Sequence, residues 1–148
     1  MFWTGFLVVL PIVLAWAERR LRLSWPPLHE PPWMWVGVAT FTAGSAVGLS
    51  SCVSMALRGD GTPLPAATAS KLVVVGPYRY VHNPMAVAGA IQTLGVGLWL
   101  GSWVVLLSAI AGAFVWNTII RPEEEADLLA RFGDPYRQYS ATVRCWLP

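Results

Sequence analysis

Long apolar runs alternate with short polar segments along the chain, and this pattern predicts membrane-spanning helices. A helix needs about 20 mostly apolar residues to cross a bilayer. Four runs come near or exceed that length, and we place the spans at about residues 2–17, 33–57, 84–100 and 103–120. The chain is therefore predicted to be an all-α, polytopic membrane protein whose residues 1–148 form a single domain.

Polar segments connect the predicted spans. Four prolines between the first and second spans cannot continue a helix and indicate a loop: Pro26, Pro27, Pro31 and Pro32. Residues 58–83 form a long loop, in which apolar residues 72–75 make a short strand or dip into the bilayer face. Residues 122–148 are predicted to form a lid of amphipathic helices on the membrane surface. Its first helix starts at acidic residues 123–125, which suit the helix dipole, and ends at Gly133.

Only Gly101 and Ser102 separate the third span from the fourth. So short a connection requires an antiparallel hairpin, and both outer ends of the hairpin then emerge on one side of the membrane. We therefore expect residues 78–83 to lie beside residues 121–125, although about forty positions separate the two segments. This juxtaposition is the main structural prediction from the sequence.

The spans contain no charged side chain, and their amides are Gln92 and Asn117. These two side chains either bond each other across the hairpin or line a substrate tunnel. The second span contains Gly44 and Gly48, a spacing that lets another helix approach closely. We favour packing inside one subunit over a dimer seam, and monomer and homodimer both stay open.

The composition agrees with a membrane protein. Apolar residues make up 55% of the 148 residues and charged residues 12%, whereas soluble domains carry about 25% charged residues. Nine tryptophans fit the same class, because indoles favour the membrane–water boundary. The net charge of +2, without any basic run, excludes a nucleic-acid partner.

Basic residues indicate the orientation. The side that carries loop 58–83 and the tail has seven Lys and Arg residues, against three on the other side. Cytoplasmic segments carry the excess of positive charge. We therefore expect a protein of the cell inner membrane, with this loop and the tail in the cytoplasm.

The cysteines and histidines give no sign of a metal site. Cys52 and Cys145 lie far apart in the chain and do not form a disulfide framework. Neither histidine, His29 or His82, has a Cys, Asp or Glu at ligand spacing. The sequence therefore predicts no bound metal.

The densest polar and aromatic run, Gly-Pro-Tyr-Arg-Tyr-Val-His-Asn-Pro-Met, occupies residues 76–85. Farther along the chain follow Glu123-Glu124 and Phe132-Gly133-xx-Tyr136-xx-Tyr139. With the loop entry at 61–65 and the closing Trp-Leu-Pro, these motifs resemble the isoprenylcysteine carboxyl methyltransferase and phospholipid methyltransferase superfamily over about residues 61–148. The resemblance implies a small integral membrane enzyme that uses S-adenosyl-L-methionine without a Rossmann domain. The chain likewise has no Gly-x-Gly-x-x-Gly signature.

The resemblance also implies which residues serve the site. The implied cofactor-binding residues are Lys71, Leu72, Val73, Tyr78, Asn83, Pro84, Met85, Ala86, Glu123, Glu124 and Tyr136. Within this set, Glu124 would meet the methionine end of the cofactor. Arg121 would face the head group of the substrate. The candidate catalytic residues are Arg121, Glu124 and His82.

The chain departs from the family pattern at several of these positions. His82 stands where the family commonly has Arg, and Ala86 where it often has Tyr. The usual Val-Pro-Arg-Trp close reads Val-Arg-Cys-Trp at residues 143–146. In the prenylcysteine enzymes the substrate-side Arg stands one position earlier, where this chain has Ile120.

The residues themselves suit this cofactor. Glutamates hold an ammonium through charge-assisted hydrogen bonds, free amides at a helix start bind a carboxylate, and tyrosine rings cover a sulfonium. His82 or a glutamate can accept the proton of an amine nucleophile. Each feature also has a simpler interpretation. Glu123, Glu124 and Glu125 can be a solvated first turn, the tyrosines can be interface anchors, and His82 can be an interfacial polar residue.

The predicted function is methyl transfer to a lipophilic acceptor, an isoprenylcysteine carboxylate or another small lipid-like substrate, with S-adenosyl-L-homocysteine as product. The alternatives are N-methylation of a phospholipid amine, and a non-enzymatic membrane scaffold or carrier subunit. A carrier places polar groups at mid-membrane, whereas this chain places them at the membrane edge. The expected partners are membrane lipids and a lipophilic or lipidated substrate.

Overall fold

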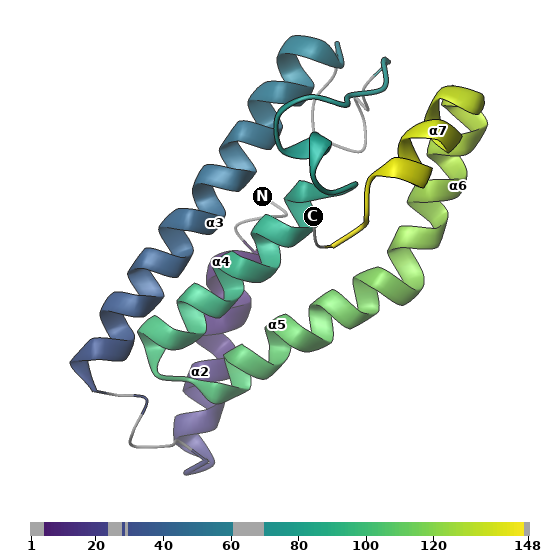
Figure 1. Ribbon diagram of the computed structural model, residues 1–148. Helices are drawn as coiled ribbons and strands as arrows, with labels where there is room; N and C mark the ends of the chain where they lie inside the picture. Colours follow the sequence, from purple (N-terminus) through teal and green to yellow (C-terminus); the bar gives the residue numbers. More distant parts are fainter. Residues whose placement is uncertain (1–4, 24–27, 29, 61–69, 147–148) are drawn as a thin grey trace. The chain divides into compact units, whose positions relative to one another are not determined.

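The computed structural model describes residues 5–23, 28, 30–60 and 70–146, and its regular structure is helical (Figure 1). These residues contain no strand, and their β-type pairing is an isolated parallel bridge between Val81 and Arg144. The all-α prediction is therefore confirmed. The chain divides into two compact units, Met1–Ser45 with Ala88–Phe114 and Ala46–Val87 with Val115–Pro148.

The second and third predicted spans coincide with helices. The second lies in α3, Pro31–Arg58, and the third is α4, Pro84–Leu100. Pro31 and Pro32 belong to the first turn of α3 instead of the preceding loop, because a first turn does not need their missing N–H groups. Pro26 and Pro27 lie outside the described residues.

The fourth span does not end where the sequence predicted. It consists of α5, Trp103–Val115, and the π-helical turn η5, Trp116–Ile120, which runs directly into α6, Arg121–Phe132. The π-helical turn accommodates Pro122, which cannot donate an intrahelical hydrogen bond. As predicted, Glu123 and Glu124 lie in the first turn of helix α6, but this helix continues from α5 through η5 without a break. The acidic residues 123–125 lie inside a continuous helix, so they do not face a free helix end.

Two helices are long and apolar enough to cross a membrane, Pro31–Arg58 and Trp103–Phe132. Helix α4 is equally apolar but shorter, and the first predicted span corresponds to η1, Gly5–Val9, and α2, Leu10–Arg20. By this criterion the described residues support two of the four predicted spans. The long helices expose large apolar side chains, such as Leu107, Ile110 and Phe114, as a surface that faces lipid does.

In the first unit, α2 is tied to the turn between α4 and α5. Glu18 is buried, and its carboxylate accepts hydrogen bonds from the Ser102 hydroxyl and, at 3.4 Å, from the Val104 amide. Arg19 donates to the Leu100 carbonyl at 3.2 Å. The helix therefore extends to Arg20, past the predicted end of the first span at residue 17.

Helices α3 and α4 also pack closely within the first unit. A Cβ atom on Gly44 would lie 3.1 Å from the Ala88 carbonyl oxygen, which agrees with the interpretation of this glycine as a packing residue inside one subunit. Gln92 donates to Ser45 at 2.9 Å.

The second unit holds the predicted loop and lid. Residues 72–75 form no strand, and Val73 is buried. A short 3-10 helix, η4, Gly76–Arg79, precedes α4. The last helix of the described residues, α7, Asp134–Thr142, packs against α6 (Figure 1). Gly133 separates α6 from α7, as predicted.

Candidate functional site

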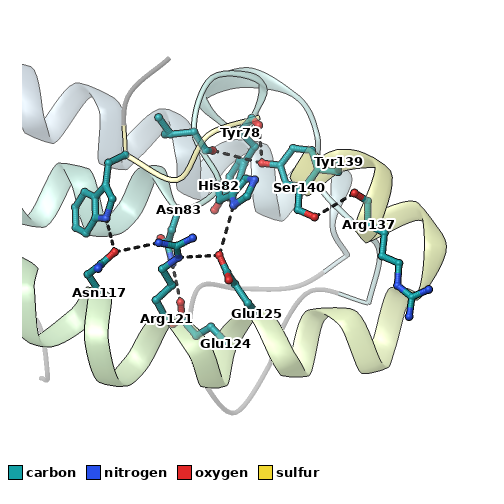
Figure 2. Close-up of polar contacts among 12 residues, drawn as sticks. Tyr78, His82, Asn83, Asn117, Arg121, Glu124, Glu125, Arg137, Tyr139 and Ser140 are labelled. Carbon is teal, nitrogen blue, oxygen red and sulfur yellow. Dashed lines mark hydrogen bonds and ion pairs between the residues drawn. The ribbon is translucent and has the colours of Figure 1, made fainter. Parts of the chain in front are cut away.

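The segment before α4 and helix α6 meet through a hydrogen bond between side chains. Asn83 Nδ2 donates to Glu124 Oε2 at 2.8 Å, and Asn83 Oδ1 accepts the Ala86 amide at 3.1 Å (Figure 2). Asn83 therefore caps the start of α4 and orients Glu124 with the same side chain. The predicted juxtaposition of residues 78–83 with residues 121–125 is confirmed.

Helix α7 closes over this segment. The Tyr139 hydroxyl donates to the Tyr78 carbonyl at 2.6 Å and lies 3.4 Å from the Val81 carbonyl oxygen (Figure 2). The His82 amide donates to the Arg144 carbonyl at 3.0 Å. The predicted lid thus folds back onto the motif, through side-chain and backbone bonds.

Arg121 connects α6 with the C-terminal segment. Its Nε donates to Glu125 Oε1 at 2.8 Å and its Nη1 to Asn117 Oδ1 at 3.1 Å (Figure 2). The same Asn117 oxygen accepts the Trp146 indole N–H at 2.8 Å. The guanidinium is therefore held by two acceptors, and Arg121 also lines the pocket described below.

His82 is the most enclosed of the candidate catalytic residues. Its side chain is 10% exposed, and its ring centroid lies 5.2 Å from that of Tyr139 and 6.4 Å from that of Tyr136. Nδ1 lies 3.6 Å from Glu125 Oε1, and neither ring nitrogen has a hydrogen-bond partner among the described residues. His82 is therefore half-buried, and both of its ring nitrogens are shielded from solvent.

A pocket of about 560 Å³ opens beside these residues. It is lined by His82, Arg121 and residues 140–146. Two of the three candidate catalytic residues, His82 and Arg121, therefore border one pocket, whereas Glu124 is not among its lining residues. Pockets for small molecules usually measure about 300–1,000 Å³.

The predicted cofactor-binding residues occupy unlike environments. Tyr78, Pro84 and Tyr136 are buried, whereas Leu72, Met85 and Ala86 are half-buried and Glu123 is exposed. Lys71 pairs with Asp60 at 2.5 Å on the surface. One of the amides at the start of α4, that of Ala86, already donates to Asn83 Oδ1.

Burial keeps the phenols of the site protonated. It raises the pKa of Tyr136 to about 12, with the nearby Glu125 and Cys145 acting in the same direction. Burial likewise raises the pKa values of Tyr78 and Tyr139 above their ordinary value, and it raises the pKa of the Cys145 thiol, which Arg121 opposes. The tyrosines are therefore hydrogen-bond donors at neutral pH.

Sequence reasoning missed Asn117, Glu125, Cys145 and Trp146 as members of this site. Sequence spacing also did not show that His82, Glu125 and Cys145 come together, with ligand atoms that all lie within 4.8 Å of one another. Their separation in the chain hid this cluster. The predicted juxtaposition of residues 78–83 with residues 121–125 could have pointed to Glu125, because it already included Glu124 as a site residue.

Comparison with known proteins identifies a family that this chain matches. A model of the phospholipid methyltransferase family matches residues 32–134. The protein-S-isoprenylcysteine O-methyltransferase of Schizosaccharomyces pombe is 38% identical over 79 residues, which are 52% of this chain and 33% of that protein. An uncharacterized protein of Haemophilus influenzae is 42% identical over 50 residues, which are 34% of this chain and 79% of the relative. The chain thus spans a third of the length of the yeast relative.

Proposed function

Because the chain belongs to the phospholipid methyltransferase family, we propose that it is an integral membrane methyltransferase that uses S-adenosyl-L-methionine. The observation that carries the proposal is the 2.8 Å bond from Asn83 to Glu124, which brings the polar motif and the acidic helix together. The similarity to a protein named for isoprenylcysteine methylation favours a lipophilic carboxylate as acceptor. The family's name supports a second candidate, a phospholipid amine.

The chemistry of the residues fits the cofactor. Its ammonium needs an anionic partner, and Glu124 offers a carboxylate that Asn83 already orients. The buried Tyr136 hydroxyl has no hydrogen-bond partner among the described residues, so a polar group of a ligand can satisfy it. The ring faces of Tyr78 and Tyr136 suit a sulfonium. The Ala86 amide is capped, so this amide is not available to the carboxylate.

When bound, the cofactor supplies an electrophilic methyl group on its sulfonium. Much of the rate of such a displacement comes from the correct positioning of the two reactants. In this proposal, residues of the second unit position the cofactor and the acceptor. Arg121, held by Asn117 and Glu125, presents a planar guanidinium that can bind a carboxylate or phosphate head group of the acceptor. A carboxylate acceptor needs no base.

An amine acceptor must lose a proton before or during the transfer. His82 Nδ1 lies 3.6 Å from Glu125 Oε1, so these two groups can receive a proton and share it. The carboxylate and amine acceptors therefore make different demands on His82. Replacing His82 by Gln would slow methylation of an amine and leave that of a carboxylate largely intact.

The location follows from the same proposal. The loop 58–83, helix α6 and the lid carry seven of the ten Lys and Arg residues, so we place the site at the cytoplasmic face of the inner membrane. There a water-soluble cofactor meets membrane lipids and a lipophilic or lipidated substrate. Monomer and homodimer both agree with such a site, and no nucleic acid is needed.

The test is a binding and transfer experiment on the purified protein in detergent micelles. Calorimetry with S-adenosyl-L-methionine and S-adenosyl-L-homocysteine measures cofactor binding. A labelled-methyl assay on a total membrane lipid extract, with a prenylated cysteine and phosphatidylethanolamine as defined acceptors, identifies the product. Absence of heat and of any thermal shift with both cofactor forms would overturn the proposal.

A further inference from the structure

Three side chains with different donor atoms converge in the second unit. One ligand atom each from His82, Glu125 and Cys145 lies within 4.8 Å of the others. They come from separate segments: the residues before α4, helix α6 and the chain after α7. We infer that His82, Glu125 and Cys145 form a binding site for a divalent ion of the zinc class.

The state of His82 points to a ligand independently of the cluster. The side chain is 10% exposed, yet both ring nitrogens are buried without a hydrogen-bond partner in the described part of the chain. A buried polar group left unsatisfied costs roughly 1–3 kcal/mol. A metal ion bound to one nitrogen removes that cost for this nitrogen, because it takes the lone pair that no donor among the described residues reaches.

The donor set selects the ion. Imidazole, thiolate and carboxylate are the ligands of zinc, whereas magnesium and calcium prefer oxygen alone. Zinc bonds of about 2.0–2.3 Å in a tetrahedral site put ligand atoms about 3.3–3.8 Å apart. His82 Nδ1 and Glu125 Oε1 already lie 3.6 Å apart. Bringing the other ligand pairs from within 4.8 Å to this spacing needs movements of about 1 Å.

The surroundings of the cluster also suit the ion. Glu125 and a deprotonated Cys145 supply two negative charges for a divalent cation. Arg121 carries a positive charge and donates to Glu125 Oε1 at 2.8 Å. This bond holds the carboxylate in place, as outer hydrogen bonds do for metal ligands. The positive charge of Arg121 lowers the affinity for the metal ion, but all three ligand atoms remain available.

Three protein ligands leave one coordination position open. His82 and Cys145 both line the 560 Å³ pocket, so the open position would face it. A water molecule or an anionic group of a pocket ligand can take that position. The ion would also pin the C-terminal segment to α6, because Cys145 and Glu125 belong to these two parts.

The experiment uses the full chain in detergent micelles, stripped with a chelator and titrated with Co²⁺ as the probe. A thiolate ligand gives an intense charge-transfer band, so the spectrum reports Cys145 directly. We expect saturation at one ion per chain and displacement of Co²⁺ by Zn²⁺. Cys145→Ser should lose the band, and the matched variant Cys52→Ser should keep it. His82→Gln or Glu125→Gln should weaken binding by at least about tenfold.

A second measurement uses only the wild-type protein, so its result does not depend on whether a variant folds. Zn²⁺ should raise the thermal midpoint of the stripped wild-type protein, and Ca²⁺ should not. The inference is overturned if the wild type shows no charge-transfer band, if the band survives Cys145→Ser, or if Zn²⁺ leaves the midpoint unchanged. All readouts are independent of methyl transfer and of cofactor binding, so the proposed methyl transfer stands or falls separately. A bound ion would occupy the His82 lone pair, so the ion and the role of His82 as base for an amine acceptor exclude each other.

Discussion

The side-chain amide of Asn83 joins two parts of the chain that are 41 positions apart by donating to Glu124 at 2.8 Å. Its oxygen simultaneously accepts the Ala86 amide in the first turn of α4. One residue thus fixes both the start of a helix and the position of a carboxylate. This double use links the fold of the second unit to the chemistry proposed for it.

Glu124→Ala should weaken S-adenosyl-L-methionine binding more than tenfold, because it removes the anionic partner of the ammonium, and a charge-assisted bond contributes about 1.5–3 kcal/mol. Calorimetry on the purified variant measures the change. Glu30→Ala is the matched control, since Glu30 is exposed at the start of α3 and away from the site residues in the sequence. Unchanged affinity in Glu124→Ala would remove this residue from the cofactor site.

Tyr139→Phe should lower the free energy of unfolding by about 1–3 kcal/mol, because it leaves the Tyr78 carbonyl without its buried donor. Thermal denaturation in one detergent measures the loss. Tyr80→Phe is the control, because the Tyr80 side chain is exposed. Equal midpoints for the two variants would show that the bond between α7 and the motif contributes nothing to stability.

Stability should fall at alkaline pH. The pKa values of Tyr78, Tyr136 and Tyr139 are raised in the folded protein, mainly by burial. Groups with a raised folded pKa contribute stability that is complete below the unfolded value of about 10 and is lost as the pH rises toward the folded value. Melting curves between about pH 8 and pH 11 should therefore show a midpoint that declines above about pH 10. Tyr139→Phe should make this decline shallower, and an identical slope would contradict the prediction.

The apolar pattern was sufficient for the helical class and for α4, whose ends match the predicted span. It also led to the juxtaposition of Asn83 with Glu124, because a two-residue turn leaves a hairpin as the only connection. The pattern failed at Pro122. A proline after an apolar run usually marks a boundary, but here a π-helical turn carries the helix through it.

The rest of the site depends on contacts that sequence spacing does not reveal. Asn117 had two possible roles inside a span, and the structure gives it a third, as the shared acceptor for Arg121 and Trp146. His82, Glu125 and Cys145 meet only because α7 folds back over the motif. Such a cluster depends on tertiary packing, which no local period of the sequence encodes.

Arg121→Lys should raise the KM for the acceptor by about tenfold and leave cofactor affinity nearly unchanged. The lysine keeps the charge but loses the planar guanidinium that bonds both Asn117 and Glu125. A loss of about 1.4 kcal/mol of binding free energy corresponds to a factor of ten in affinity. The labelled-methyl assay at varied acceptor concentration measures KM, and calorimetry measures the cofactor. Arg137→Lys is the control, because Arg137 forms an exposed pair with Asp134 on α7. A fall in cofactor affinity with unchanged KM would assign Arg121 to the cofactor instead.

Gly95→Ala should destabilise the first unit by about 1–3 kcal/mol, the usual cost of overpacking. A Cβ atom on Gly95 would lie 2.6 Å from the Phe41 amide nitrogen and 2.8 Å from the Gly37 carbonyl oxygen. Both contacts are backbone atoms of α3, so relief requires the two helices to separate. Gly112 in α5 has open space around its Cβ position, so Gly112→Ala should be neutral or stabilise by up to about 1 kcal/mol. Thermal midpoints of the two variants in the same detergent compare these effects directly. Equal midpoints would mean that α3 and α4 do not approach closely at Gly95, and that the packing of this pair rests on side chains alone.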